Sequence, residues 1–322
     1  MSIGWYRSSL RGTKMPLRHL GFIELPAHAK PGGFDHAAVD EATGRIYVAH
    51  TANDAVDIVD IEARKYLGSI ENLTGVAGAL VVPGRDLLVT SNRGENTVGI
   101  VRLGEHVSVH KIPVGVRPNG LAYDARRARL LVAHVGDPGI PGSRVVSIVD
   151  VLAQQRIADV CVAGRTRWAV CDTIADDYHI NIADPPQIVV IGAGDPVRIR
   201  RVIPVGHAGP HGLDIDVTRR RLFCGCDAGV VVEIDADTGQ TLRAQVIAGV
   251  PDVVFLDAGL RRLYVAIGDP GVIEVFDTAP LRRHETIPTE LGAHTLSFDA
   301  SRHIVCAFLP ASHRVAVYRD HA

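Results

Sequence analysis

The stretch Gly209-Pro-His-Gly-Leu-Asp-Ile-Asp216, followed by Arg219-Arg-Arg-Leu-Phe-Cys-Gly-Cys226, decides the fold. It predicts a short strand, a basic turn and a returning strand. The chain repeats this pattern seven times, and the residues that close the first strand of each repeat are Asp40, Pro83, Asp124, Asp172, Asp216, Asp257 and Asp299. Successive positions in this series are 41 to 48 residues apart. Such a period, with several short strands per unit, predicts an all-β, seven-bladed β-propeller with four-stranded antiparallel blades.

The two ends of the chain indicate how the ring closes. Residues 17–25 have the apolar content of a strand but precede the first full repeat, and the last repeat, from Ala293 to Tyr318, supplies only three strands. We therefore expect the N-terminal strand to complete the last blade, which leaves no broad unpaired edge. The expected organisation is a tail over residues 1–14 and one propeller domain over residues 15–322.

Composition narrows the classes of partner and compartment. The chain has 322 residues, of which 47% are hydrophobic, and a formal net charge of -2, so it has no cationic field for nucleic acid or anionic lipid. No apolar run approaches the roughly 18 residues of a membrane span. Met1 to Lys14 contains no signal-like apolar core, and five cysteines without a framework spacing indicate a reducing compartment. The expectation is a cytoplasmic protein with a small-molecule substrate, and a protein partner stays open.

Three stretches carry a family resemblance: Ile46 to Asp60, Leu130 to His134 with Val145 to Asp150, and Leu263 to Ala266 with Val272 to Asp277. They resemble the repeat of the YVTN-type, lactonase-like seven-bladed propellers over about residues 30–322. Proteins with this repeat serve as lactonases, cofactor-bearing enzyme subunits, surface-layer proteins and binding modules, so the resemblance implies the fold more than the activity. The family motif has Asn after the second strand, and here that place is assigned to His50, Ser91, His134, Ile182, Cys226, Ile267 and Phe308.

Polar residues recur where the first strand of each repeat begins. The first strand of a blade lines the central channel, and the second runs antiparallel beside it, so first-strand starts and second-strand ends share one face. The predicted ring of first-strand starts is Asp35 (with His36 next), Gly78, Asn119, Arg167 (with Trp168 next), His211, Asp252 and His294. Convergent polar groups at the mouth of a pocket define a candidate site. Secondary candidates are Asp35, His50, His134, Cys226 and Trp168.

The chemistry of this ring favours a metal-dependent reaction. Two or three imidazoles with a carboxylate suit a divalent transition metal such as Zn, Fe, Ni or Cu. We expect His36, His211 and His294 to hold the metal and Asp252 to be a ligand or general base. Asn119 and Arg167 would orient the substrate. The predicted function is a small-molecule enzyme, a metal-dependent hydrolase or lyase, and the lactonase direction comes from the resemblance alone.

Other interpretations of the same residues stay open. Without a metal, His211 or His294 is a general base and Arg167 an oxyanion clamp. A second alternative is that the ring lines a solvated channel in a non-enzymatic scaffold that binds a protein or ligand. A third is that the protein carries a metal or a redox cofactor. Residues 136–142 form a Gly/Pro rim loop that we expect to set specificity. Cys224 and Cys226 lie on one strand face in a geometry unsuited to a disulfide.

Overall fold

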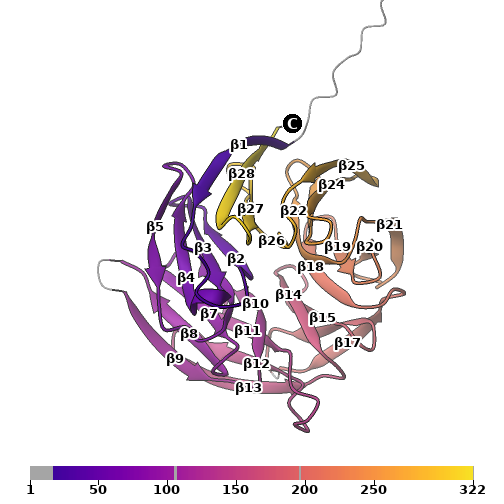
Figure 1. Ribbon diagram of the computed structural model, residues 1–322. Helices are drawn as coiled ribbons and strands as arrows, with labels where there is room; N and C mark the ends of the chain where they lie inside the picture. The colour runs from indigo at the N-terminus through magenta and orange to yellow at the C-terminus, as the bar shows by residue number, and fades with distance from the viewer. Residues whose placement is uncertain (1–16, 105–106, 196, 322) are drawn as a thin grey trace, which may run out of the picture.

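The structure, a computed structural model, describes residues 17–104, 107–195 and 197–321. Within these ranges seven four-stranded antiparallel sheets form a ring around a central axis, as Figure 1 shows. The predicted seven-bladed propeller is confirmed. The tail predicted over residues 1–14 lies outside the described residues. None of the helical segments in the described ranges has the length and apolar character needed to cross a membrane.

The blades follow one another along the chain, and blades one to six each consist of four consecutive strands from the axis outward. Blades one to three comprise β2 (Ala37–Asp40), β3 (Arg45–His50), β4 (Ala55–Asp60) and β5 (Lys65–Ile70); β6 (Val76–Val82), β7 (Leu87–Asn92), β8 (Thr97–Arg102) and β9 (Ser108–Pro113); and β10 (Pro118–Asp124), β11 (Arg129–His134), β12 (Val145–Asp150) and β13 (Gln155–Cys161). A 3-10 helix, η1 (Thr51–Asn53), follows β3.

Blades four to six repeat the arrangement. They comprise β14 (Thr166–Asp172), β15 (Asp177–Ile182), β16 (Gln187–Gly192) and β17 (Ile199–Pro204); β18 (Pro210–Asp216), β19 (Arg221–Cys226), β20 (Val230–Asp235) and β21 (Thr241–Val246); and β22 (Pro251–Asp257), β23 (Arg262–Ile267), β24 (Val272–Thr278) and β25 (Leu281–Pro288). Blade seven takes three strands from the end of the chain, β26 (Thr295–Asp299), β27 (Ile304–Leu309) and β28 (Arg314–Asp320).

The N-terminal strand closes the ring as predicted. Strand β1 (Leu17–Glu24) pairs antiparallel with β28, from Leu17 opposite Asp320 to Glu24 opposite Arg314, and completes the sheet β1-β28-β27-β26. In Figure 1 the indigo β1 lies beside the yellow β28. The first and last described strands therefore hold one another, and the ring has no open seam between blades seven and one.

The repeated aspartates fix the turn after each inner strand. The Asp216 carboxylate accepts the backbone N–H of Arg219 at 2.8 Å and the guanidinium of the same residue at 2.9 Å. Asp257 likewise accepts the backbone N–H of Leu260 at 2.8 Å. Short polar side chains that bond backbone two or three residues ahead stabilise tight turns, which explains why the sequence signal recurs at this point of each blade. Pro83 is the exception among the seven.

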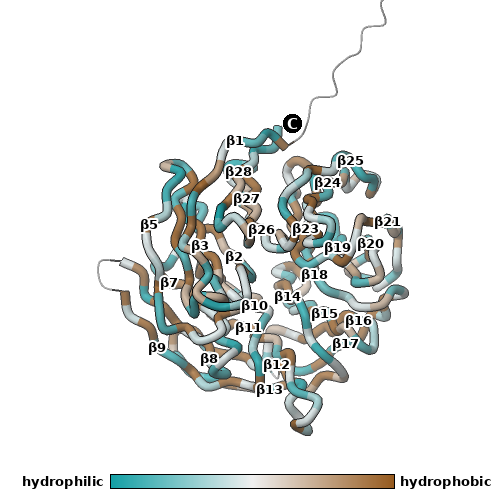
Figure 2. The backbone as a smooth tube through the Cα atoms, viewed as in Figure 1, coloured by the Kyte–Doolittle hydropathy of each residue, from teal (hydrophilic) through white to brown (hydrophobic). Residues whose placement is uncertain are grey.

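Apolar packing holds neighbouring blades together. In the described residues seven hydrophobic clusters are present, one at each interface between adjacent blades. Second strands such as β3 and β15 are buried along nearly their whole length, because a neighbouring blade covers each face. Outer strands such as β13 and β21 are largely exposed. Hydrophobic and hydrophilic residues alternate along much of the backbone in Figure 2, as strands with differently covered faces require.

Glycines allow the inner strands to approach one another closely. A Cβ at Gly120 would lie 2.5 Å from the carbonyl oxygen of Arg167, and one at Gly212 would clash with the carbonyl oxygen of Asp252. Both carbonyls belong to residues of the predicted ring on the next blade. Since only glycine leaves room for this backbone contact, these positions set the spacing between neighbouring ring residues.

Replacing Gly212 by alanine is expected to destabilise the protein by about 1–3 kcal/mol, because a new methyl group must displace the backbone at Asp252. Urea unfolding followed by circular dichroism measures the change. Gly206→Ala is the matched control, since a Cβ there meets no heavy atom within 4 Å. Equal unfolding midpoints for the two variants would contradict the role given to Gly212.

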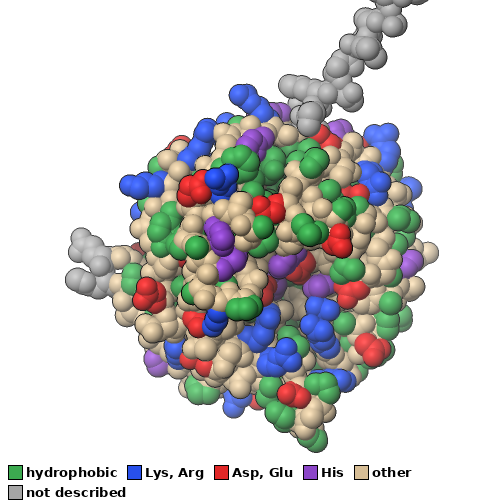
Figure 3. Space-filling model, viewed as in Figure 1, with side chains coloured by type: hydrophobic (Ala, Val, Ile, Leu, Met, Phe, Trp, Pro, Cys, Tyr) green, Lys and Arg blue, Asp and Glu red, His purple; other side chains and the backbone are tan. Residues whose placement is uncertain are grey.

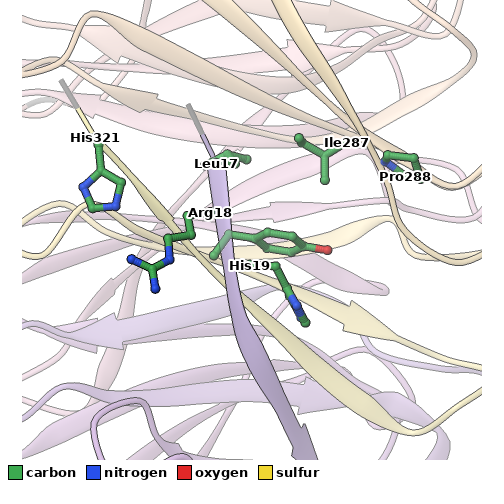
Figure 4. A pocket seen from close by; sticks show the side chains of 7 residues that line it. Leu17, Arg18, His19, Ile287, Pro288 and His321 are labelled. Atoms are coloured by element: carbon green, nitrogen blue, oxygen red, sulfur yellow. The ribbon is translucent and has the colours of Figure 1, made fainter. Parts of the chain in front are cut away.

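A hollow lies at the outer rim of the disc, where β1 and β28 meet β25. It has a volume of about 590 Å³ and is lined by Leu17, Arg18, His19, Ile287, Pro288, Tyr318 and His321. Figure 4 shows that side chains of β1 form much of its wall. This hollow belongs to the closing seam and shares no lining residue with the central channel.

Candidate functional site

The candidate site surrounds the mouth of the central channel, where the inner strands begin. The ladder between first and second strands is interrupted at this point in blades three to six, for example between Pro210 and Leu213 and between Pro251 and Val254. Such irregularities commonly redirect a side chain beside an active site. Here they coincide with Asn119, Arg167, His211 and Asp252. Figure 3 shows histidine, acidic and basic side chains around a hollow at the centre of the disc.

One position of the predicted ring needs correction. Strand β6 ends at Val82, one residue before Pro83, because a proline has no N–H for the ladder and begins the turn. Val76 pairs with Asn92 as Pro210 pairs with Cys226, so the ring position of blade two is Ala77 and not Gly78. Gly78 instead occupies the position of Gly212. Two of the predicted second-strand ends also move by one residue. Strand β7 ends at Asn92 and not at Ser91, and β27 ends at Leu309 and not at Phe308.

His211 is the most strongly anchored group at the mouth. Its Nδ1 lies 2.7 Å from Asp227 Oδ1, and its Nε2 lies 3.0 Å from Asp252 Oδ1. Nε2 is also 3.0 Å from the Arg167 guanidinium, which in turn reaches Asp227 at 3.4 Å. The imidazole, 16% exposed, is therefore held between two carboxylates from blades five and six, with a second cation beside it.

His294 faces the same carboxylate from the next blade. Its Nδ1 lies 2.7 Å from the carbonyl oxygen of Gly292, and because a carbonyl can only accept, Nδ1 carries the proton. Nε2 lies 3.7 Å from Asp252 Oδ2, so in the neutral imidazole a lone pair faces the mouth. With 40% of its side chain exposed, His294 is accessible to a small molecule.

The environment moves the pKa values of His211 and Asp252 in opposite directions. Burial lowers the pKa of His211, but the hydrogen bonds to Asp227 and Asp252 outweigh burial and the nearby Arg167 and raise it to about 9. Burial opposes ionisation of Asp252, yet its hydrogen bond to His211 and the charges of His211, His294 and His36 hold its pKa well below the usual range. At neutral pH the pair is imidazolium and carboxylate.

The other side of the mouth is organised around Asp35. Its carboxylate accepts the Arg93 guanidinium at 3.0 Å and lies 3.3 Å from His36 Nε2. Arg93 also donates to the Asn119 side chain. The ring of Trp168 lies 4.1 Å from that of His36, whose pKa is lowered chiefly by burial. His36 and Trp168 line the cavity of the central channel, and Asp35 and Asn119 are joined through Arg93.

The remaining secondary candidates lie away from this cluster. His50 is buried with its Nδ1 2.7 Å from Asp57 and its Nε2 2.7 Å from His28. His134 is buried against Ser147, and burial lowers its pKa to about 4. Cys226 packs in the core between blades four and five with its sulfur 3.8 Å from that of Cys224, and both thiols are free. Each of these side chains contributes to a blade interior.

The arrangement differs from a preformed metal centre. Among the described residues, no group of three or more His, Cys, Asp or Glu side chains is placed so that it could hold a metal ion. The Arg167 guanidinium lies 3.0 Å from His211 Nε2, the nitrogen that would have to coordinate the metal. As placed, His36, His211 and His294 do not form a ligand set.

Below the mouth the channel is apolar. A cavity of about 240 Å³ begins at His36 and Trp168, and a second of about 580 Å³ opens towards the opposite face. The two share the lining residues Leu80, Leu121, Val170 and Asp214. Burial raises the pKa of Asp214 to about 6, although backbone N–H groups of Leu256 and Ile215 donate to its carboxylate at 2.7 Å.

Asp214 makes folding stability depend on pH. Because its folded-state pKa lies above the unfolded value of 3.8, the uncharged carboxyl stabilises the fold at low pH, and that contribution is lost as pH rises through about 6. The shift corresponds to about 2–3 kcal/mol. We expect the stability of Asp214→Asn minus that of the wild type to be larger at pH 7.5 than at pH 4.5. Urea unfolding at both values measures this, and an offset independent of pH would contradict it.

The sequence prediction missed three residues of the candidate site and its channel: Arg93, Asp227 and Asp214. Arg93 and Asp227 directly follow the second strands β7 and β19, on the face already identified, so extending that face by one residue would have found them. Asp214 carries no such signal, because a single acid in an alternating strand resembles a solvated residue. The predicted rim loop, residues 136–142, lines a separate hollow of about 350 Å³ on blade three.

Comparisons with known proteins support the fold only. No protein-family model matches the sequence, and no curated protein matches it. A solved structure of hydrazine synthase from Kuenenia stuttgartiensis superposes with a TM-score of 0.79 and 14% sequence identity, over 91% of this chain and 97% of that chain. At this level of identity the likeness shows a shared propeller architecture and nothing about activity.

Proposed function

We propose that the channel mouth is the active site of a small-molecule enzyme that hydrolyses an ester or lactone. The observation that carries the proposal is the row His211, Asp252 and His294, in which the His211 imidazolium and the exposed His294 imidazole, whose Nδ1 is bonded to a carbonyl, flank one carboxylate. Neighbouring titratable groups whose pKa values are driven apart are typical of acid–base sites. The residues come from three consecutive blades and share one accessible mouth.

Each side chain has a defined task in this proposal. His294 Nε2 accepts a proton from water, whose oxygen attacks the substrate carbonyl, while the Arg167 guanidinium stabilises the developing oxyanion. His211 donates its Nε2 proton to the leaving alkoxide as the C–O bond breaks. A lactone and water thus give a hydroxy acid, and Asp252 returns the proton from His294 to His211. The same acceptor and donor would serve a lyase if the first proton came from carbon.

A substrate panel tests the proposal. Aliphatic lactones, aryl esters and β-hydroxy acids are offered to the purified protein, and acid release or alkene formation is recorded. We expect turnover of at least one lactone or ester, lost in the variant Asp252→Asn with His294→Gln. If every compound that binds is left intact, the mouth belongs to a non-enzymatic binding scaffold.

A transition-metal centre is the second candidate. It is favoured by one observation, that both His211 and His294 have Nδ1 anchored and Nε2 turned towards Asp252, as metal-binding histidines do. His211, His294 and Asp252 would have to rearrange around the ion, with His36 nearby. Metal content after reconstitution with Zn, Fe, Ni or Cu measures this. On this second candidate, the protein would hold near-stoichiometric metal that is lost in His211→Ala with His294→Ala, and retention by that variant would refute the ligand set.

The lactone direction rests on the resemblance of the repeats to the YVTN-type propellers. Membership of that family is part of this proposal, as is a small molecule as the natural ligand. A metal or redox-cofactor carrier would bind metal without turnover, and a scaffold would show neither, so the two experiments together separate the three classes.

A further inference from the structure

Arginines gather on one side of the channel mouth. Arg117 and Arg165 directly precede the inner strands β10 and β14, Arg93 follows β7, and Arg167 lies within β14. All four therefore lie on the mouth face of blades two to four, whereas His211, Asp252 and His294 belong to blades five to seven. Figure 3 shows basic side chains clustered along one edge of the central hollow.

The four guanidinium groups differ in their partners. Arg93 is paired with Asp35 and Arg167 with Asp227. Among the described residues, no carboxylate or other side chain is hydrogen-bonded to the guanidinium of Arg117 or Arg165, and both residues are exposed. Partial burial, followed by the charges of Arg167, Arg117 and Arg93, lowers the pKa of Arg165. The cluster therefore holds like charges close together without enough protein anions to balance them.

Other exposed arginines do not form such a cluster. Arg85 and Arg261 are exposed and have no ion pair within the described residues, but they lie apart, on blades two and six. On the opposite face Arg127 binds Asp124 and Asp176, and Arg221 binds Asp235. Those arginines are used within the fold, so the arginine cluster at the mouth is not a general consequence of basic turns.

We propose that Arg117 and Arg165 bind the oxyanion group, carboxylate or phosphate, of a small acidic substrate whose reacting carbonyl extends across the axis to His211 and His294. Guanidinium groups bind such anions through charge-assisted, often paired hydrogen bonds. Arg93 and Arg167, each paired with a carboxylate, add positive potential at Arg165. The substrate orientation rests on the proposed function, whereas the anion site stands on its own.

A small anion fits the mouth better than a polyanion. Asp35 on blade one and Asp227 and Asp252 on blades five and six flank the arginines around the hollow, and their carboxylates would repel an extended phosphate backbone or an anionic lipid surface. A single oxyanion can lie against Arg117 and Arg165 without meeting these acids.

Isothermal titration calorimetry with inorganic phosphate and with succinate tests the site at low ionic strength. We expect the wild type to bind one of the two, and Arg117→Gln with Arg165→Gln to weaken that binding about 10- to 100-fold. Preference between the probes identifies phosphate or carboxylate as the recognised group. Arg319→Gln is the matched control, because this exposed arginine lies on β28 at the rim.

Two further measurements keep the result interpretable. Thermal melts should show the double variant at least as stable as the wild type, because the substitutions relieve charge repulsion. Weaker anion binding by a variant of this stability cannot then be attributed to misfolding. His211→Gln should lose turnover and retain anion binding. Unchanged affinity in the double variant, or no binding of either probe by the wild type, overturns the anion site. Anion binding without turnover of any substrate would overturn the proposed enzyme and leave this site standing.

Discussion

Replacing His211 by glutamine is expected to lower kcat/KM for the hydrolysed substrate by about 10²- to 10⁴-fold, the range of general acid–base catalysis. The glutamine amide can donate hydrogen bonds to Asp227 and Asp252, but it is not acidic enough to transfer a proton to an alkoxide. It also removes the cation that keeps Asp252 ionised. Steady-state kinetics at pH 7 measures the loss.

The chain supplies a matched control for this substitution. His303 Nδ1 lies 2.5 Å from Asp257, so His303→Gln alters a second imidazole–carboxylate pair, located at the turns of the opposite face. We expect its kcat/KM to stay within about twofold of the wild type, as for surface substitutions away from a site. Equal losses in the two variants would mean that His211 acts through stability and not through proton transfer.

The pH profile adds an independent test of the same residue. With a folded-state pKa of about 9, His211 keeps its donor proton through neutral pH, and activity should fall as pH rises through about 9. Its contribution to stability is fully present below the unfolded pKa of 6.5 and is lost over the same rise. A rate that instead increases up to pH 10 would contradict the donor role.

The second large effect concerns closure of the ring. Ile23 is buried between blades seven and one, and Leu17 between blades six and seven. Ile23→Ala is expected to cost about 2–5 kcal/mol, a large part of the 5–15 kcal/mol that stabilises a typical protein. Phe22→Ala on the same strand is the control, because Phe22 is 49% exposed. Urea unfolding compares the two variants.

Removal of the whole closing strand should act more strongly. A chain that begins at Leu25 leaves the edge of β28 without its partner, and an open edge of this kind pairs with other chains. We expect a lower melting temperature and association in size-exclusion chromatography, both reversed by a synthetic peptide of residues 17–24. A monomer as stable as the wild type would show that β1 does not close the fold.

Sequence alone was sufficient for the architecture because turn chemistry repeats. The aspartate after each inner strand bonds the turn directly, so a local signal marked six of the seven blades. Where proline replaces this residue in blade two, the register moved by one, and Gly78 was placed in the ring instead of Ala77. The predicted closure needed only the count of strands at the two ends.

The chemistry of the mouth was harder to predict. The position of a residue along a strand predicts the face of the disc on which it lies, but not whether its side chain reaches the channel or is buried in the blade. His50 and His134 end their strands on the correct face, yet each turns into its blade to meet Asp57 or Ser147. Asp227 became visible only through its distance to His211, which joins residues on different strands. Pairings of this kind depend on side-chain rotamers, which no repeat pattern encodes.

The glycine-to-carbonyl contacts between inner strands have a consequence for how this protein can change. They fix the spacing of the inner strands around the central channel, whichever side chains line that channel. Gly120 and Gly212 therefore cannot be replaced without moving the backbone, while a ring position such as Asn119 can exchange one functional group for another. New specificity can arise there by single substitutions, without rebuilding the scaffold.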